Sequence, residues 1–133
     1  MHTKKRDSKI ENACLKSLVG FMNKNGGTLF VGIDDDSNIL DLEKLESCDI
    51  DKLQRLLTDL IKNRIGADFL CYIDIDLIRG NDGNCITVRC KKSDNPVFLK
   101  ISKDDHRFYV RSGSSTEQLN ASDTQDYIKR RFE

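Results

Sequence analysis

The sequence lacks several features that would point to particular classes of protein. Its 133 residues include no tryptophan and one proline. There are only two histidines, which argues against a histidine-based catalytic triad or metal cluster. No apolar run approaches the length of a membrane span, and no signal-type hydrophobic segment follows the basic N-terminus. Net charge is also absent, since 22 Lys and Arg balance 22 Asp and Glu. We therefore expect a cytoplasmic protein that has no membrane partner and holds any polyanion through a local basic patch.

The cysteines lack the spacing of a metal site or a disulfide framework. There are five of them, an odd number, and no C-x-x-C pair occurs. Cys14 and Cys71 lie in apolar sequence typical of a helix or strand. This pattern favours reduced thiols in a cytosolic protein.

What the chain does have is one stretch, residues 23–36, around which the rest is organised. Gly26 and Gly27 follow a predicted helix, and paired glycines allow the positive φ or close backbone approach that the end of a helix often requires. Residues 29–33 are apolar except for a single glycine. A run this dense predicts a strand that is covered on both faces, at the centre of a sheet.

The hydrophobic periodicity predicts the remaining elements and an α+β fold. Capping-box sequences begin at Ser8 and Ser122, and the closing helix leaves Lys129, Arg130 and Arg131 in solvent. We expect a mixed, largely antiparallel sheet with helices packed on it, forming one domain over residues 9–133. Residues 1–8 are predicted to be a flexible basic arm or a vector-derived remnant. The predicted helices cover residues 9–24, 51–65 and 124–132, and the predicted strands cover residues 29–33, 70–78, 85–91, 97–101 and 108–111.

An acidic turn, Asp34-Asp35-Asp36, follows the first strand. It does not complete a calcium loop, because Ile39 and Leu45 occupy the positions of the required glycine and glutamate. A Mg²⁺ or Mn²⁺ site is less demanding, since one or two carboxylates at a strand end can hold the ion together with water and phosphate. Asp34 and Asp35 are therefore candidate metal ligands, and a plain solvated turn is the alternative.

A second candidate site follows the strand at residues 108–111. Arg111 precedes a loop of serines, glycine and threonine, so a guanidinium, several hydroxyls and a flexible backbone come together. Such a loop can bind phosphate, although it lacks the glycine-lysine pair of a Walker A loop, which argues against nucleotide hydrolysis. The alternative is an ordinary surface turn. The candidate phosphate-binding residues are Arg111, Ser114, Ser115, Thr116 and Lys100.

The chain resembles the Schlafen-type, Alba-like domain family over residues 11–132. Three blocks carry the resemblance, and their order and separation also match the family. They are FMNKNGGTLFVGIDDD at residues 21–36, PVFLK at residues 96–100 and FYVRSGSST at residues 108–116. The resemblance implies a module that binds DNA or RNA and is usually fused to regulatory, ATPase or effector domains.

The resemblance also implies a possible nuclease chemistry. In animal Schlafens the domain cleaves structured RNA, and three carboxylates are held responsible: two glutamates before the first helix and an aspartate after the glycine-rich strand. Asp34 or Asp35 matches the aspartate. The present chain departs from the family upstream, because residues 1–9 contain Asp7 as their single acid in place of a segment with Glu and then Glu-Phe-Lys. Two of the three carboxylates are therefore missing, and a metal would be held weakly.

We predict a nucleic-acid-binding module of a larger regulatory or defence protein. It would contact the phosphate backbone without reading bases, with the acidic turn and the arginine loop on one shared surface. Two alternatives stay open: a metal-dependent endoribonuclease with an incomplete active site, and a module that dimerises or docks partner domains. For this chain alone, binding is favoured over catalysis.

Overall fold

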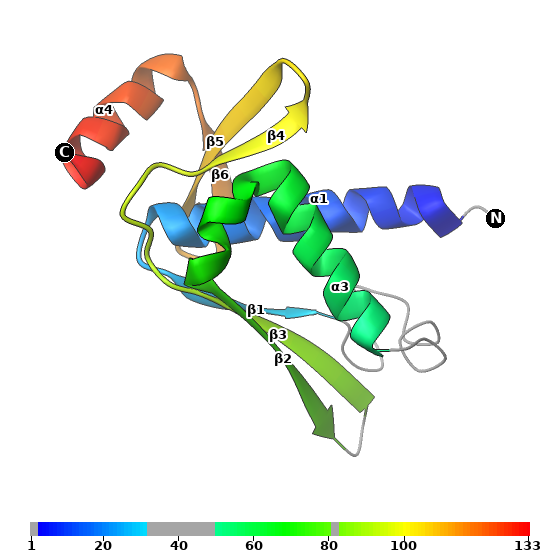
Figure 1. Ribbon diagram of the computed structural model, residues 1–133. Coiled ribbons are helices and arrows are strands. Elements are labelled where there is room, and N and C mark those ends of the chain that lie inside the picture. Colours follow the sequence, from blue (N-terminus) through cyan, green and yellow to red (C-terminus); the bar gives the residue numbers. More distant parts are fainter. Residues whose placement is uncertain (1–2, 32–49, 81–82) are drawn as a thin grey trace.

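The computed structural model describes residues 3–31, 50–80 and 83–133, and it has an α+β fold (Figure 1). The long helix α1 runs between two antiparallel sheets of three strands each. The predicted fold class is confirmed, with the strands divided between two sheets. The elements in chain order are α1 (Thr3–Asn23), β1 (Gly27–Val31), α3 (Ile50–Ile61), the π-helix η1 (Lys62–Gly66), the 3₁₀ helix η2 (Ala67–Tyr72), β2 (Ile73–Gly80), β3 (Gly83–Cys90), β4 (Phe98–Ser102), β5 (Asp105–Ser112), β6 (Ser115–Leu119) and α4 (Ala121–Phe132).

The core lies on both sides of α1. Leucine, valine and methionine side chains of this helix are fully buried, because apolar residues recur at helical spacing on more than one of its faces. They pack against β3 of one sheet, against β4 and β5 of the other, and against α3. The main members are Leu15, Leu18, Val19 and Met22 of α1 with Ile61, Ile86, Val88, Leu99 and Tyr109.

Among the described residues, the first sheet has the order β1-β3-β2, so β3 and not β1 is its central strand. The prediction that β1 is covered on both faces is wrong. Leu29 packs against the core, but Phe30 points to the other face and its side chain is 51% exposed. A dense apolar run of this length does not by itself distinguish a two-sided strand from a one-sided strand with an exposed aromatic.

Several element boundaries differ from the predictions. Helix α1 begins at Thr3, so Ser8 lies inside it and does not cap it. The predicted helix over residues 51–65 is divided into α3 and η1, and Gly66, with φ of 135°, separates η1 from η2. Cys71 is exposed in η2 rather than placed in a strand. Strand β6 was not predicted, because its sequence STEQL has no apolar alternation.

Asn23, at the end of α1, binds three other parts of the chain. It is fully buried, and its Nδ2 donates to the backbone oxygens of Val97 and Tyr109, both at 2.9 Å. Its Oδ1 accepts from the Val97 N–H, also at 2.9 Å. Its own backbone oxygen accepts from Tyr127 Oη at 2.7 Å and from Arg131 Nε at 3.1 Å. Asn23 thus ties α1 to β5, to the residue preceding β4, and to α4.

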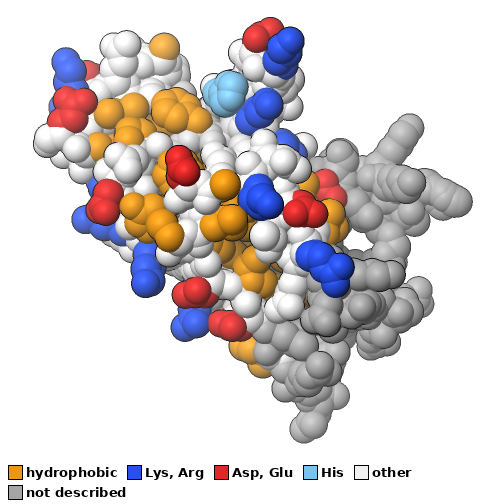
Figure 2. Space-filling model, in the orientation of Figure 1, with side chains coloured by type: hydrophobic (Ala, Val, Ile, Leu, Met, Phe, Trp, Pro, Cys, Tyr) orange, Lys and Arg blue, Asp and Glu red, His pale blue; other side chains and the backbone are white. Residues whose placement is uncertain are grey.

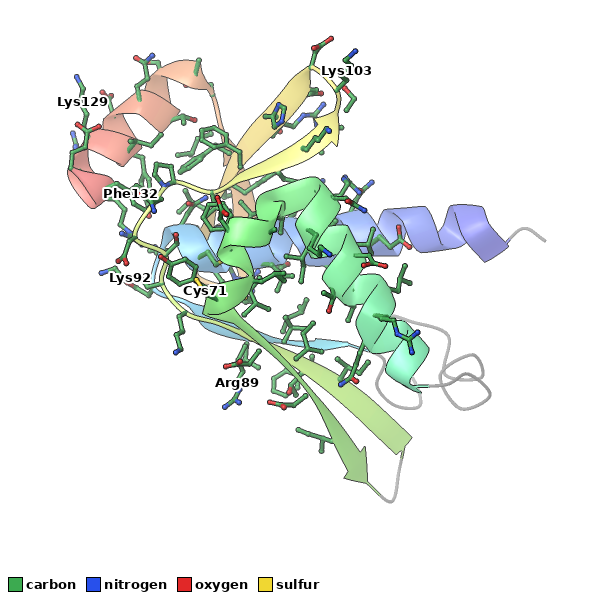
Figure 3. All side chains as sticks on the ribbon, viewed as in Figure 1. Cys71, Arg89, Lys92, Lys103, Lys129 and Phe132 are labelled. Carbon is green, nitrogen blue, oxygen red and sulfur yellow. The ribbon has the colours of Figure 1, made fainter. Side chains whose placement is uncertain are left out.

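Helix α4 is capped and docked differently from the prediction. Its N-cap is Asn120, whose Oδ1 accepts from the Asp123 N–H at 2.8 Å, so Ser122 is not the cap. Arg131 is not in free solvent as predicted, because its Nη2 also donates to the Ser93 oxygen at 2.7 Å. Lys129 does point away from the body of the domain (Figure 3).

The described cysteines agree with the prediction of reduced thiols. Cys14, Cys71 and Cys90 are free. Burial, with a smaller contribution from Glu11, raises the pKa of Cys14 to about 11, and burial raises that of Cys90 to about 12. These two thiols therefore stay protonated near neutral pH. None of the described helices is both long and apolar enough to cross a bilayer.

Candidate nucleic-acid interface

Arg111 lies near the end of β5, on the face that packs against α1. Its Nε donates to the Gly113 oxygen at 3.2 Å, and its Nη1 donates to Thr116 Oγ1 at 3.0 Å. The guanidinium carbon lies 5.1 Å from the centre of the Phe21 ring, a cation–π contact. Nη2 makes no hydrogen bond with the described residues, so the guanidinium is held in place while keeping N–H donors for a ligand.

Glycines allow three segments to approach one another: helix α1, the turn at Gly26 and Gly27, and the loop that follows Arg111. A Cβ on Gly20 would lie 3.2 Å from the Arg111 nitrogen, and one on Gly27 would lie 2.5 Å from the Phe21 ring. Gly26 has φ of 86°, and a Cβ there would lie 2.7 Å from the Cys90 oxygen. The predicted need for glycine at residues 26 and 27 is confirmed. Because Phe21 fits over Gly27, it can also contact Arg111.

Two concavities, each of about 420 Å³, adjoin at Arg111. We name them the Lys16 concavity and the Lys24 concavity. No Asp or Glu is among the described residues that line either of them. The Lys16 concavity is lined by Asn12, Ala13, Lys16, Ser17, Arg111, Ser114, Ser115 and Thr116. The Lys24 concavity is lined by Phe21, Lys24, Asn25, Gly26, Thr28, Arg111 and Gly113.

The three cations of these concavities form a row. Lys16, Gly20 and Lys24 follow one another at four-residue spacing, so they lie along one side of α1 and its end. The rise of a helix separates the two lysines by roughly 12 Å along the axis. Arg111 lines both concavities, whereas Lys16 lines one and Lys24 the other, so Arg111 lies between the two lysines. We call Lys16, Arg111 and Lys24 the cation row.

The hydroxyls of the loop differ in what they can offer a ligand. Ser115 Oγ lies 2.9 Å from Glu117 Oε2, to which it donates, and 3.3 Å from the Ser112 oxygen. Thr116 Oγ1 accepts from Arg111. Ser114 makes no hydrogen bond within the described part of the chain and is exposed. Ser114 is therefore the loop hydroxyl best able to donate to a phosphate.

Lys100, predicted to bind phosphate with Arg111, lies on the opposite face of its sheet. The β4–β5 register pairs Lys100 with His106 and Leu99 with Arg107. Cross-strand partners share a face, and successive residues of β5 point to opposite faces. Arg111 therefore shares a face with Arg107 and not with His106. The structure brings Arg111, Ser114, Ser115 and Thr116 together and leaves Lys100 apart from them.

The predicted metal ligands Asp34 and Asp35 lie outside the described residues. Within residues 3–31, 50–80 and 83–133, no group of three or more His, Cys, Asp or Glu side chains could hold a metal ion. Strand β1, which leads toward the acidic turn, begins beside the Lys24 concavity at Gly27. Of the two features predicted to share a surface, only the arginine loop lies within the described residues.

On the face shown in Figure 2, the described cations do not form a surface of one sign. Figure 2 shows Lys and Arg interspersed with Asp and Glu on the face seen in Figure 1. Arg89 pairs with Asp76 at 3.0 Å, and Arg107 pairs with Asp105 at 2.8 Å. The hydrogen bond from Arg107 lowers the pKa of the Asp105 carboxyl. These charges are neutralised locally, unlike those of the cation row.

Lys16 and Lys24 were missed by reasoning from the sequence. Their four-residue spacing with Gly20 was visible, but polar residues on a helix are more often simply solvated. Only the packing of Gly20 against β5 shows that they flank Arg111.

Comparison with known proteins bears on the identity of the domain. A model of the Schlafen, AlbA_2 family matches residues 1–120. The chain belongs to this family. The match runs from α1 through β6, includes every residue of both concavities, and ends just before α4.

One solved structure of similar fold is the crystal structure of the DIP2311 protein from Corynebacterium diphtheriae. The similarity has a TM-score of 0.53 at 20% sequence identity and covers 90% of this chain, which supports the fold. The Schlafen AlbA_2 chain described here spans 19% of the length of that chain. No curated protein matches it.

Proposed function

We propose that this Schlafen AlbA_2 domain binds nucleic acid, DNA or RNA, through the phosphate backbone. The observation that supports this most directly is the cation row. Three cations flank two adjoining concavities without a carboxylate among the described lining residues, in a chain whose 22 basic and 22 acidic residues balance. A surface of one sign is what a polyanion requires of a protein without net charge.

Each group of the row has a distinct part in this proposal. Arg111 offers a planar fork of donors to one phosphate, while Lys16 and Lys24 act as point charges for neighbouring phosphates. Ser114 and the amides of Asn12 and Asn25 add neutral donors. Contacts to phosphate position a protein but carry no sequence information. We therefore expect weak dependence on base sequence.

Salt dependence tests the proposal. Three phosphate contacts give a slope of log affinity against log salt of about −2.7 for duplex DNA and about −2.1 for single strands. The double variant Lys16→Ala, Lys24→Ala should reduce the steepness for duplex DNA by about 1.8. The measurement is fluorescence anisotropy with labelled single- and double-stranded DNA and RNA over a range of salt concentrations.

A matched control has the same change in charge at other places. Lys103 lies in the β4–β5 turn and Lys129 on α4, both exposed and outside the concavities (Figure 3). The double variant Lys103→Ala, Lys129→Ala should leave the slope nearly unchanged. Equal losses in the two double variants, or binding that ignores salt, would reject the assignment of the row.

We also propose that the domain works as one module of a larger protein. The 19% share of the DIP2311 chain that it covers is consistent with this arrangement. A regulatory or defence role belongs to the whole protein and depends on its other domains. If the domain were mainly a docking unit, light scattering would show a stable dimer while no nucleic acid bound.

A further inference from the structure

Phe30 is an exposed aromatic side chain on the outer face of the first sheet. It is 51% exposed, and its ring has no aromatic partner among the described residues. Its neighbour Leu29 packs toward the core, so Phe30 points away from α1. A single exposed apolar residue is unremarkable by itself. The residues around Phe30 distinguish it from other exposed apolar residues.

Strand β1 borders the Lys24 concavity. Thr28 lines that concavity together with Lys24 and Arg111. Thr28 and Phe30 are two residues apart on one strand, so they share a face and lie about 7 Å from each other. An aromatic ring is therefore exposed two residues along β1 from a cationic concavity that has no carboxylate among its described lining residues.

No described acid lies directly beside Phe30 on the outer face of the sheet. Among the described residues, the nearest acids on this face are on β2, and β3 separates them from β1. Phe30 pairs with Thr87, which pairs in turn with Asp76, so Asp76 lies about 10 Å away across two strands. Arg89, which points away from the helices in Figure 3, binds Asp76 at 3.0 Å. The closest carboxylate of the described sheet is thus already neutralised.

The other exposed apolar residues lack this combination. Phe98 is 37% exposed, but its ring packs on Phe108 at 5.1 Å and lies on the face of its sheet opposite Arg111. Leu56 and Ile78 are not aromatic. Of the exposed large apolar side chains in the described structure, Phe30 alone joins an aromatic ring to a cationic concavity.

We propose that Phe30 stacks on an unpaired base of a single-stranded nucleic acid whose adjacent phosphate occupies the Lys24 concavity. The inference rests on the proposed function and deepens it, because it names single strands as the preferred ligand. Stacking requires a base whose face is accessible, and a duplex hides that face. It is tolerant of sequence, since every base has a π-face. Duplexes would be held by the cation row alone.

The test compares variants on single strands and on a duplex. The probes are labelled oligothymidylate, oligouridylate and a DNA duplex, each of about 12 nucleotides or base pairs. Phe30→Ala should weaken single-strand affinity by about fivefold to a hundredfold and leave duplex affinity unchanged. Phe30→Leu, which keeps apolar bulk without a π-face, should lose nearly as much. Ile78→Ala is the matched control, since Ile78 is also 51% exposed on the outer face.

A spectroscopic readout detects the stacking itself. The chain contains no tryptophan, so Phe30→Trp introduces a single reporter. This variant should keep its affinity for single strands, and its emission should be quenched when oligothymidylate or oligouridylate is added. Ile78→Trp should not be quenched. Agreement between DNA and RNA probes would show that the sugar is not read.

The possible failures separate the two proposals. If the wild type binds single strands and Phe30→Ala binds them equally well, the stacking proposal is overturned and the cation row stands. The same conclusion follows if Phe30→Ala weakens duplex and single strands alike. If the wild type binds no nucleic acid, both proposals fail. Circular dichroism of each variant verifies that the fold is kept.

Discussion

The two ends of β5 carry the same side chain on the same face in different surroundings. Arg107, at one end, makes two hydrogen bonds to Asp105, at 3.1 and 2.8 Å. Arg111, at the other, contacts only a carbonyl, a hydroxyl and an aromatic ring in the described structure. Both cations are fixed, but among the described residues only Arg107 has a carboxylate bound to it. The arrangement of acids, rather than the number of bases, therefore marks the candidate surface.

The largest expected effect is a loss of stability when Asn23 is replaced, because Asn23 binds β5 midway between these two arginines. Asn23→Ala removes three buried hydrogen bonds, one of them to the Tyr109 oxygen midway along the strand. The free energy of unfolding should fall by about 3 kcal/mol, because buried backbone groups lose their partners. Urea denaturation measures it.

Asn25→Ala is the control for this stability change. Asn25 is exposed in the turn after α1, so its loss should cost less than about 0.5 kcal/mol. A similar small change for Asn23→Ala would mean that Asn23 does not bridge the elements as described.

The second-largest expected effect comes from a variant that gives Arg111 a neighbouring carboxylate, as Arg107 has. Ser114→Asp places a carboxylate beside the guanidinium in the Lys16 concavity. Affinity for nucleic acid should fall by about tenfold, because the new charge neutralises Arg111 and repels phosphate. Titration of labelled single strands and duplexes gives the value. Ser114→Asn, which is similar in shape but uncharged, should remain within about twofold of the wild type; an equal loss in both would point to a steric cause.

The smallest expected effect concerns the ion pair between Arg107 and Asp105, at the other end of β5. The Arg107 hydrogen bond lowers the pKa of Asp105 from its ordinary value of 3.8. A carboxyl with a lowered folded-state pKa stabilises the fold above about pH 3.8, and this contribution is lost as pH falls through the folded-state pKa. Both side chains are exposed, so the contribution is small.

An NMR titration measures this shift directly. The Asp105 midpoint should lie below 3.8 in the wild type and return toward 3.8 in Arg107→Ala. A midpoint that does not respond to Arg107→Ala would show that the pair is not formed in solution.

Much of this fold could be predicted because its elements have clear periodicity. The apolar pattern of α1, the alternation on β2 and β3, and the glycines at the end of α1 all correspond to the structure. The polar strand β6 could not be found this way, since only Leu119 in it is apolar. The edge position of β1 depends on which strands pair with it, and its own sequence does not determine that.

The candidate site was predictable only in part. Arg111 and its loop are contiguous in sequence, so their chemistry could be read from the chain. Lys16 and Lys24 join them only through the packing of Gly20 on β5, which is a tertiary contact. Lys100 was assigned to the site because the strand register, which sets its face, is not visible in the sequence.

The most direct test of the central claim compares the two arginines of β5. Arg111→Ala and Arg107→Ala remove the same group from the same face, and affinity for labelled single-stranded DNA and RNA is measured at one fixed, low salt concentration. We predict that Arg111→Ala weakens binding by about tenfold to a hundredfold, while Arg107→Ala stays within about twofold of the wild type. Equal affinities for the two variants would contradict the account.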